Sequence, residues 1–156
     1  MKLFKKISLF MFTCLSLVGL TGCGSENIEG TLEDLMTNVY SGISEAERPM
    51  LMNTEVTEEN IEYYLGTTDI EYEEALASEP MMGSIAHSVV LVRTKDNTDI
   101  EAIKTKIKEN IDPRKWICVW VEEEDVIVEN RGNLIILIMV EDEATRTKIQ
   151  EGFNNL

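Results

Sequence analysis

His87 is the only histidine in the chain, and with its neighbour Ser88 it is the first candidate for a metal-binding or catalytic residue. A zinc site needs thiolate, imidazole or carboxylate partners at ligand spacing, and none surrounds His87. Adjacent residues of a strand point to opposite faces of a sheet, which argues against a catalytic Ser–His pair. We therefore expect a sheet-face histidine with a local hydrogen bond. We expect no catalytic residue, metal ion or cofactor.

The densest group of carboxylates is the run Glu-Glu-Glu-Asp at 122–125. Carboxylate oxygens bind calcium, but consecutive side chains of an extended segment diverge. A solvated turn between two strands is therefore favoured over a calcium loop. The segment 96–99 also fails as an EF-hand, because Ile100 and Glu101 stand where an oxygen ligand and a glycine are needed.

Trp116 and Trp120 share the parity of Cys118 within an expected strand at 116–121, so all three should point to one face. An outward face would form an aromatic platform for a partner or ligand. Core packing is favoured, with Cys118 as an inert buried thiol. The same choice, between core filling and an adaptable groove, applies to four methionines, and core filling is again favoured: Met50, Met52, Met81 and Met82.

Composition narrows the function classes. The 156 residues carry 14 Lys+Arg against 29 Asp+Glu, a formal net charge of -15. Nucleic-acid binders need clustered basic residues, so a nucleic-acid partner is not expected. With 44% hydrophobic residues, the chain is expected to fold. It contains no Walker loop, G-x-S-x-G motif or dinucleotide fingerprint.

The N-terminus is typical of a secretory signal peptide, with a basic start (Lys2, Lys5 and Lys6) before an uncharged apolar run at 7–20. As a helix, that run would span about 21 Å, short of the roughly 30 Å hydrocarbon core of a bilayer. Cleavage is therefore favoured over an uncleaved membrane anchor.

The next residues, Leu20-Thr21-Gly22-Cys23, resemble the lipobox of bacterial lipoproteins. The resemblance implies cleavage between Gly22 and Cys23 and a diacylglyceryl group on the Cys23 sulfur. The expected organisation is a signal peptide at 1–22, a lipidated flexible tether at 23–30 and a single domain at 31–156. The acyl chains would hold that domain on the extracytoplasmic face of the cell membrane.

Periodicity and capping patterns predict the elements of the domain. Helices are expected at 31–43, from Thr57 to a stop at Gly66, at 98–111 and at 142–154. Strands are expected at 50–52, 69–78, 85–94, 116–121, 126–129 and 134–140. The last three strands have short connections and should form an antiparallel meander, although seven consecutive apolar residues at 134–140 are typical of a strand covered on both faces. The expected fold is an α+β two-layer sandwich, with a mainly antiparallel sheet of about four to five strands and the helices on one face.

Several of these segments together resemble a bacterial lipoprotein family, domain of unknown function 4358. The likeness rests on Pro80-Met81-Met82, on Ala86-His87, on 89–93, on the helix with Glu101, Ile103 and Lys104, on Trp116 and on the hairpin 128–140. It covers about residues 60–154. It implies a cell-surface lipoprotein of small α+β fold, and it supplies no catalytic residue.

We therefore expect a membrane-anchored, non-enzymatic binding or accessory module. Its partners would be the membrane, through the N-terminal lipid, and an envelope protein or a small molecule. One alternative is a cell-envelope hydrolase that uses two carboxylates, but the sequence does not single out a pair among its 29 acidic residues. The other alternative is a structural or assembly partner, which a flat apolar patch at Trp116 and Trp120 would favour.

Overall fold

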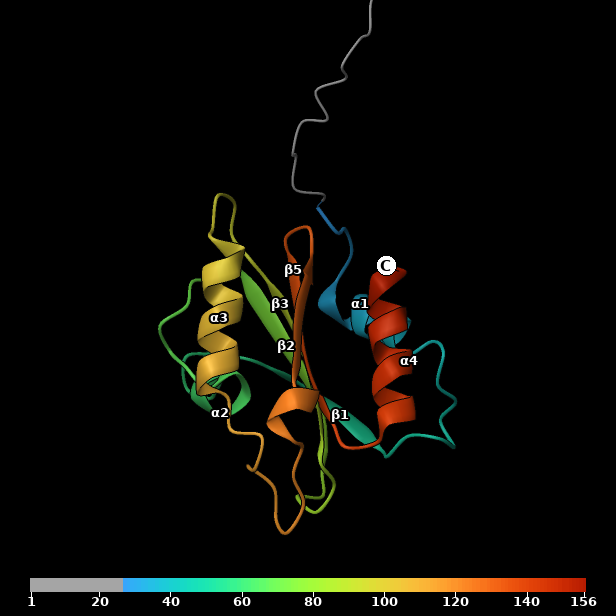
Figure 1. Cartoon of the computed structure of the whole chain (residues 1–156). Coiled ribbons are helices and arrows are strands. Elements are labelled where there is room, and N and C mark those ends of the chain that lie inside the picture. The colour runs from blue at the N-terminus through green and yellow to red at the C-terminus, as the bar shows by residue number, and fades with distance from the viewer. Residues whose placement is uncertain (1–26) are drawn as a thin grey trace, which may run out of the picture.

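The computed structural model describes residues 27–156 (Figure 1). The predicted signal peptide, Gly22 and the predicted lipidation site Cys23 lie outside the described residues. Within 27–156, none of the helices has the length and apolar character needed to cross a bilayer.

The centre of the domain is a five-stranded sheet in which every neighbouring pair is antiparallel. Its strands are β1 (Leu51–Glu55), β2 (Glu74–Pro80), β3 (His87–Arg93), β4 (Ile127–Arg131) and β5 (Leu134–Val140). The spatial order is β1-β2-β3-β5-β4, so β1 and β4 are the two edges. The predicted α+β class with a mainly antiparallel sheet is confirmed.

Helices cover both faces of this sheet, which corrects the expectation that they cover one (Figure 1). On one side lie α1 (Leu32–Val39) and α4 (Glu143–Asn154), and on the other lie α2 (Ile61–Leu65) and α3 (Ile100–Asn110). The central strands β3 and β5 account for the second helical layer. All of their residues are buried, and a strand that is apolar on both faces must be covered on both. The domain therefore has three layers.

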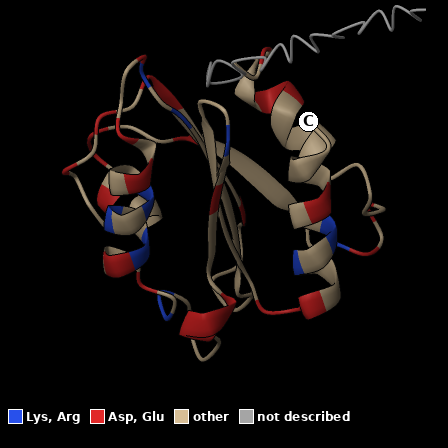
Figure 2. Cartoon of the chain, turned by 45° about the horizontal axis from the view of Figure 1, so that its top comes forward, with Lys and Arg blue, Asp and Glu red and all other residues tan. Residues whose placement is uncertain are grey.

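Alternation along the central strands divides the core into two clusters. Val90, Val92 and Leu137 point to the side of α2 and α3, whereas Val89 and Ile136 point to the side of α1 and α4. The strands carry little charge, and most acidic and basic residues lie on the helices and loops (Figure 2).

Local signals account for most helix ends. Thr31 and Asp142 accept hydrogen bonds from the backbone N–H groups of the first turns of α1 and α4, as N-caps do. The N-cap of α3 is Asp99, one residue after the expected Thr98. Helix α2 ends at Gly66 with φ +74°, a conformation that favours glycine.

The predicted strand at 116–121 is wrong, and the segment forms a loop without strand pairing. Cys118 has φ 61°, in the left-handed region, which interrupts an extended chain. Backbone bonds hold the loop instead: the Ile117 N–H donates to the Gly83 carbonyl (2.7 Å) and the Val121 N–H to the Pro113 carbonyl (3.0 Å). The predicted three-stranded meander is thus reduced to the β4–β5 hairpin.

Candidate functional site

The first candidate site is built on a buried hydrogen bond between α1 and the sheet. Tyr40, the C-cap of α1, places its hydroxyl 2.8 Å from His87 Nε2, and the two rings stack with centroids 5.9 Å apart. His87 is therefore a hydrogen-bonded sheet-face histidine, as predicted, but its partner is distant in sequence rather than local. Ser88 points to the other face, where its hydroxyl lies 3.5 Å from Lys115 Nζ. The two faces of β3 thus separate Ser88 from His87.

Burial keeps the Tyr40–His87 pair uncharged. Desolvation raises the pKa of Tyr40 well above its ordinary value of 10.0, and a hydrogen bond with Ser78 partly opposes the rise. Desolvation and the nearby Arg48 charge lower the pKa of His87 from 6.5 to about 4. Near neutral pH both rings are therefore neutral, the state that costs least in an apolar environment.

Beside this pair, a groove of about 720 Å³ runs between α1 with its following loop and the edge strand β1. We call it the α1–β1 groove. Tyr40 and Ser78 line it, and Arg48, whose guanidinium carbon lies 5.1 Å from the centroid of the Tyr40 ring, contributes a cation. Methionines and other apolar side chains supply much of the remaining lining: Met36, Pro49, Met50, Leu51 and Met52.

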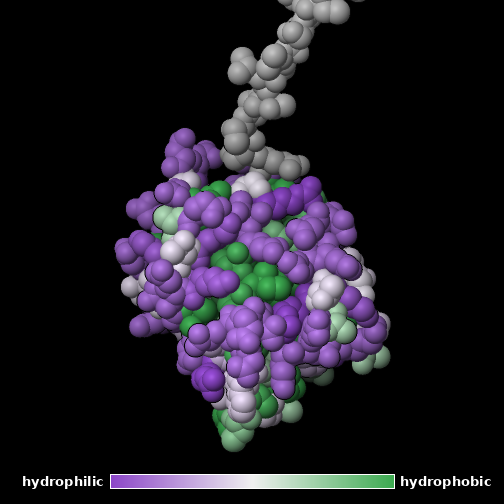
Figure 3. Space-filling model, in the orientation of Figure 1, coloured by the Kyte–Doolittle hydropathy of each residue, from purple (hydrophilic) through white to green (hydrophobic). Residues whose placement is uncertain are grey.

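The four methionines singled out in the sequence are exposed, so the prediction that they fill the core is wrong. Met50 and Met52 are 83% and 52% exposed and line the α1–β1 groove. Met81 and Met82 are also exposed and follow Pro80, the partner of Leu51 at the end of the β1–β2 ladder. The loop that joins β2 and β3 lies at the lower end of the molecule in Figure 1, and apolar atoms reach the surface at this end in Figure 3. These four side chains are exposed because Met52 lies in the edge strand β1 and the other three lie just outside β1 and β2.

Trp116 and Trp120 do not share a face. Trp116 is 9% exposed and belongs to the core beneath α2 and α3, whereas Trp120 is 45% exposed. The Trp120 Nε1–H donates to Glu122 (2.8 Å), and Arg114 lies 5.4 Å from the centroid of its ring. Cys118 is exposed, which corrects the expected buried thiol. The alternation expected of a strand fails because the segment is a loop.

Lys115 occupies a buried polar position that the sequence analysis missed. Its ammonium forms an ion pair with Glu79 (2.6 Å), and both side chains are largely buried. Three aromatic rings surround it, with Tyr63 4.3 Å, Tyr64 5.3 Å and Trp116 5.5 Å from Nζ to the ring centroid. Burial lowers the pKa of Lys115, and Glu79 opposes that shift. These groups come from three separate segments, 63–64, 79 and 115–116, so beyond the two adjacent pairs no short motif indicates the cluster.

The acidic run at 122–125 forms a 3₁₀ turn, η1 (Glu123–Asp125). Asp125 pairs with Arg146 at 2.7 Å, and Glu122 accepts the bond from Trp120. Over residues 27–156, no group of three or more potential metal ligands lies together.

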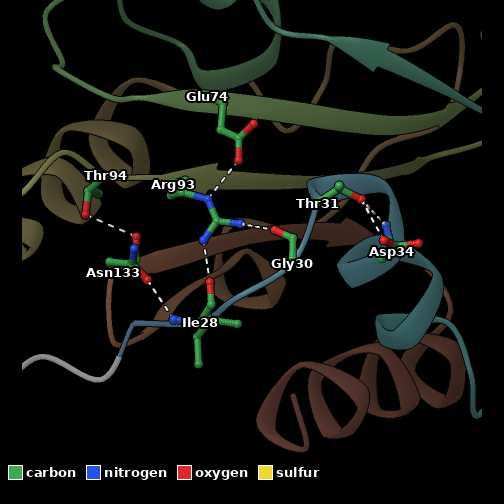
Figure 4. Close-up of polar contacts among 8 residues, drawn as sticks. All are labelled: Ile28, Gly30, Thr31, Asp34, Glu74, Arg93, Thr94 and Asn133. Carbon is green, nitrogen blue, oxygen red and sulfur yellow. Dashed lines mark hydrogen bonds and ion pairs between the residues drawn. The ribbon is translucent and has the colours of Figure 1, made fainter.

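A last polar cluster fixes the start of the described chain to the sheet (Figure 4). We call it the Arg93 cluster: Ile28, Gly30, Glu74, Arg93 and Asn133. The Arg93 guanidinium donates to the carbonyl of Ile28, to that of Gly30 (2.7 Å) and to the Glu74 carboxylate (2.7 Å). The Ile28 N–H donates to the Asn133 side chain at 3.0 Å. Residues 28–30, expected to belong to a flexible tether, are thus held against the domain.

These features define a small α+β domain with a groove along one sheet edge. A family model described as Domain of unknown function (DUF4358) matches residues 49–140, more than half of the chain. The chain belongs to this family, as the resemblance in its sequence implied. No curated protein and no solved structure matches it.

Proposed function

We propose that this protein is a lipid-anchored, extracytoplasmic binding module whose α1–β1 groove holds its ligand or partner. The groove is the observation that carries the proposal, because it combines exposed methionines and a cation with a volume of about 720 Å³, and ligand sites commonly have roughly 300–1,000 Å³. Its exposed methionines can adapt to an apolar ligand, and Arg48 can orient a polar one.

The sequence supports the anchoring part of the proposal through its basic start, its apolar run and Cys23. Cys23 precedes Ile28 by five residues, a stretch that spans at most about 17 Å when fully extended. Ile28 is held by the Arg93 cluster, so lipidation at Cys23 would place the domain close to the membrane surface.

The groove supports binding better than hydrolysis. Among residues 27–156, Glu45 is the only acidic residue that lines it, whereas a glycosidase mechanism needs two carboxylates. A pKa of about 4 makes His87 a weak general base at neutral pH, and His87 is buried and bonded to Tyr40. The polar groups near the groove therefore serve to shape it rather than to transfer protons.

Mass spectrometry of the chain purified from its native membranes tests the anchor. We expect an N-terminal Cys23 that carries a diacylglyceryl group. Cys23→Ala is the matched control and should lack the acyl group. A chain with Met1 retained and no acyl adduct contradicts the anchoring proposal.

Site-specific photo-cross-linking in the same membranes tests the groove. A benzophenone amino acid at Met50 should label a molecule that the same probe at the exposed Lys108 on α3 does not label. Arg48→Ala should reduce the Met50 product, because it removes the cation of the groove. Equal labelling from Met50 and Lys108 contradicts the assignment of the groove as the binding site.

A further inference from the structure

The edge strand β1 presents unpaired backbone groups to the α1–β1 groove. Pairing with β2 alternates along β1, as in any antiparallel ladder, and the bond from the Val56 N–H to the Ala75 carbonyl (2.9 Å) sets the phase. The backbone N–H and C=O groups of Thr54 and Met52, two and four positions earlier, therefore also face β2. The N–H and C=O groups of Leu51, Asn53 and Glu55 face outward. The Asn60 side chain binds the Glu55 carbonyl (3.0 Å), which leaves Leu51 and Asn53 as the open positions.

The groove lies between this open edge and a helix. Met36 and Thr37 of α1 line one side of it, and residues 50–53 line the other. An extended peptide placed there would pair with the backbone of β1 and direct alternate side chains toward α1. Strand addition between an edge strand and a neighbouring helix is an established mode of peptide recognition.

The other edge of the sheet is protected. Side chains of the flanking helices bind those of β4: Lys104 binds Asn130 at 2.9 Å, and Gln150 binds Glu129 at 2.6 Å. Charged residues and covering side chains are the usual means by which a sheet edge avoids pairing. In β1, by contrast, residues 51–54 are uncharged, and no strand of the described chain pairs with their outer side.

Arg48 indicates the charge of the occupant. Arg48 is half-buried, its guanidinium lies over the Tyr40 ring, and no carboxylate of residues 27–156 forms an ion pair with it. A carboxylate supplied by a bound segment would satisfy this cation in a chain that is otherwise strongly acidic.

We propose that the α1–β1 groove binds an extended peptide segment of another protein, which adds as a sixth strand next to β1 and pairs an acidic residue with Arg48. This inference rests on the proposed binding function and specifies the partner for the same site. Backbone hydrogen bonds at Leu51 and Asn53 contribute most of the binding energy, while the methionines accommodate apolar side chains of the segment.

The test uses a display library of random peptides, selected on the purified full chain in detergent. We expect enriched peptides to bind Asn53→Ala about as well as the parent protein and to bind Asn53→Pro at least tenfold more weakly. Proline removes only an outward N–H at this position and is tolerated on sheet edges, so the fold should persist. Thermal unfolding checks the fold of each variant.

A second measurement avoids dependence on that variant. An enriched peptide is N-methylated at single residues in turn. Alternate positions, those facing β1, should lose affinity, and the positions between them should retain it. Replacing the acidic residue of the peptide with its amide should weaken binding to the parent protein at least fivefold. The Arg48→Gln variant should bind the acidic peptide and the amide peptide equally well.

Several outcomes overturn the inference: no enriched peptide, equal binding to Asn53→Pro and Asn53→Ala, or N-methylation effects without alternation. Sedimentation that shows a dimer abolished by Asn53→Pro would assign the edge to a second copy of the chain instead. If a Met50 cross-link in membranes survives Asn53→Pro, the binding function stands and strand addition falls. If Met50 and Lys108 label alike, the proposed function of the groove fails as well.

Discussion

Arg93 on β3 and Gly30, 63 residues earlier in the chain, are joined by a 2.7 Å hydrogen bond from the guanidinium to the carbonyl oxygen (Figure 4). The same guanidinium binds Ile28 and Glu74, so one largely buried side chain connects the N-terminal segment to the central sheet. The point at which the chain leaves the domain is therefore set by the tertiary structure.

Arg93→Met should release this segment. The variant leaves the carbonyls of Ile28 and Gly30 without their charged donor, and we expect the free energy of unfolding to fall by about 3 kcal/mol. Hydrogen exchange should accelerate at 28–31, while urea unfolding reports the loss of stability. Lys95→Met, at an exposed residue nearby, is the control. Unchanged protection at 28–31 in Arg93→Met would show that the cluster does not hold the segment.

Stability should decrease as the pH falls from 6.5 to about 4. The pKa of His87 is lowered to about 4 in the folded protein, whereas an unfolded histidine titrates near 6.5. In that window the unfolded state binds the additional proton, so acid favours unfolding, by about 3 kcal/mol at the lower end. Urea unfolding at a series of pH values measures the effect.

His87→Gln is the control for this pH dependence, because glutamine can bond to Tyr40 but does not titrate. Its stability should vary much less between pH 6.5 and 4.5. Below pH 4.5 both proteins should lose stability, because Ser44 and Lys148 lower the pKa of Glu47 to about 2 in the folded protein and the unfolded state therefore binds this proton first. Parallel curves for the two proteins above pH 4.5 would refute the role of His87.

Lys115→Met should cost about 3–5 kcal/mol, since it leaves Glu79 buried without its cation. The double variant Lys115→Met, Glu79→Gln should recover much of this loss, because no unpaired charge remains. Thermal and urea unfolding of the single and double variants form a double-mutant cycle. Additive losses in the cycle would mean that the pair is not coupled.

The two tryptophans should respond differently to truncation. Trp116→Ala removes a buried ring from the core beneath α2 and α3 and should lower the free energy of unfolding by about 3 kcal/mol. Trp120→Ala should cost less than about 1 kcal/mol, because its ring is exposed. Similar melting temperatures for the two variants would contradict these positions.

Gly152→Ala tests the contact between α1 and α4. A Cβ at this position would lie 2.1 Å from the Val39 carbonyl oxygen, so the two helices must separate, and we expect a loss of at least about 2 kcal/mol. Gly42→Ala is the matched control, since its Cβ would meet no atom within 4 Å. A Gly152→Ala variant as stable as the Gly42→Ala variant would exclude close packing of the helices here.

Sequence reasoning succeeded where the signal was local. The caps Thr31 and Asp142 and the stop at Gly66 were predicted, because each acts within one turn of its own helix. The seven apolar residues of β5 also indicated a strand covered on both faces. The segment 116–121 was wrongly predicted because its β-branched and aromatic residues favour a strand, whereas backbone bonds to the distant Gly83 and to the nearby Pro113 hold it as a loop.

The functional surfaces were harder to predict than the elements. His87 was correctly placed on a sheet face, but its partner Tyr40 comes from another element of the fold. The exposure of the methionines and the ring of aromatic side chains around Lys115 depend on segments that meet only after folding. No pattern within a short window contains that information.

The sequence by itself determined the α+β class, most helix and strand positions and the membership of the family, because periodicity, caps and turns act over a few residues. The tertiary structure alone decided that helices cover both faces, that β1 is an open edge beside a groove and that Arg93 holds residues 28–30. These features arise from contacts between residues far apart in the chain, and such contacts form only when the whole domain packs.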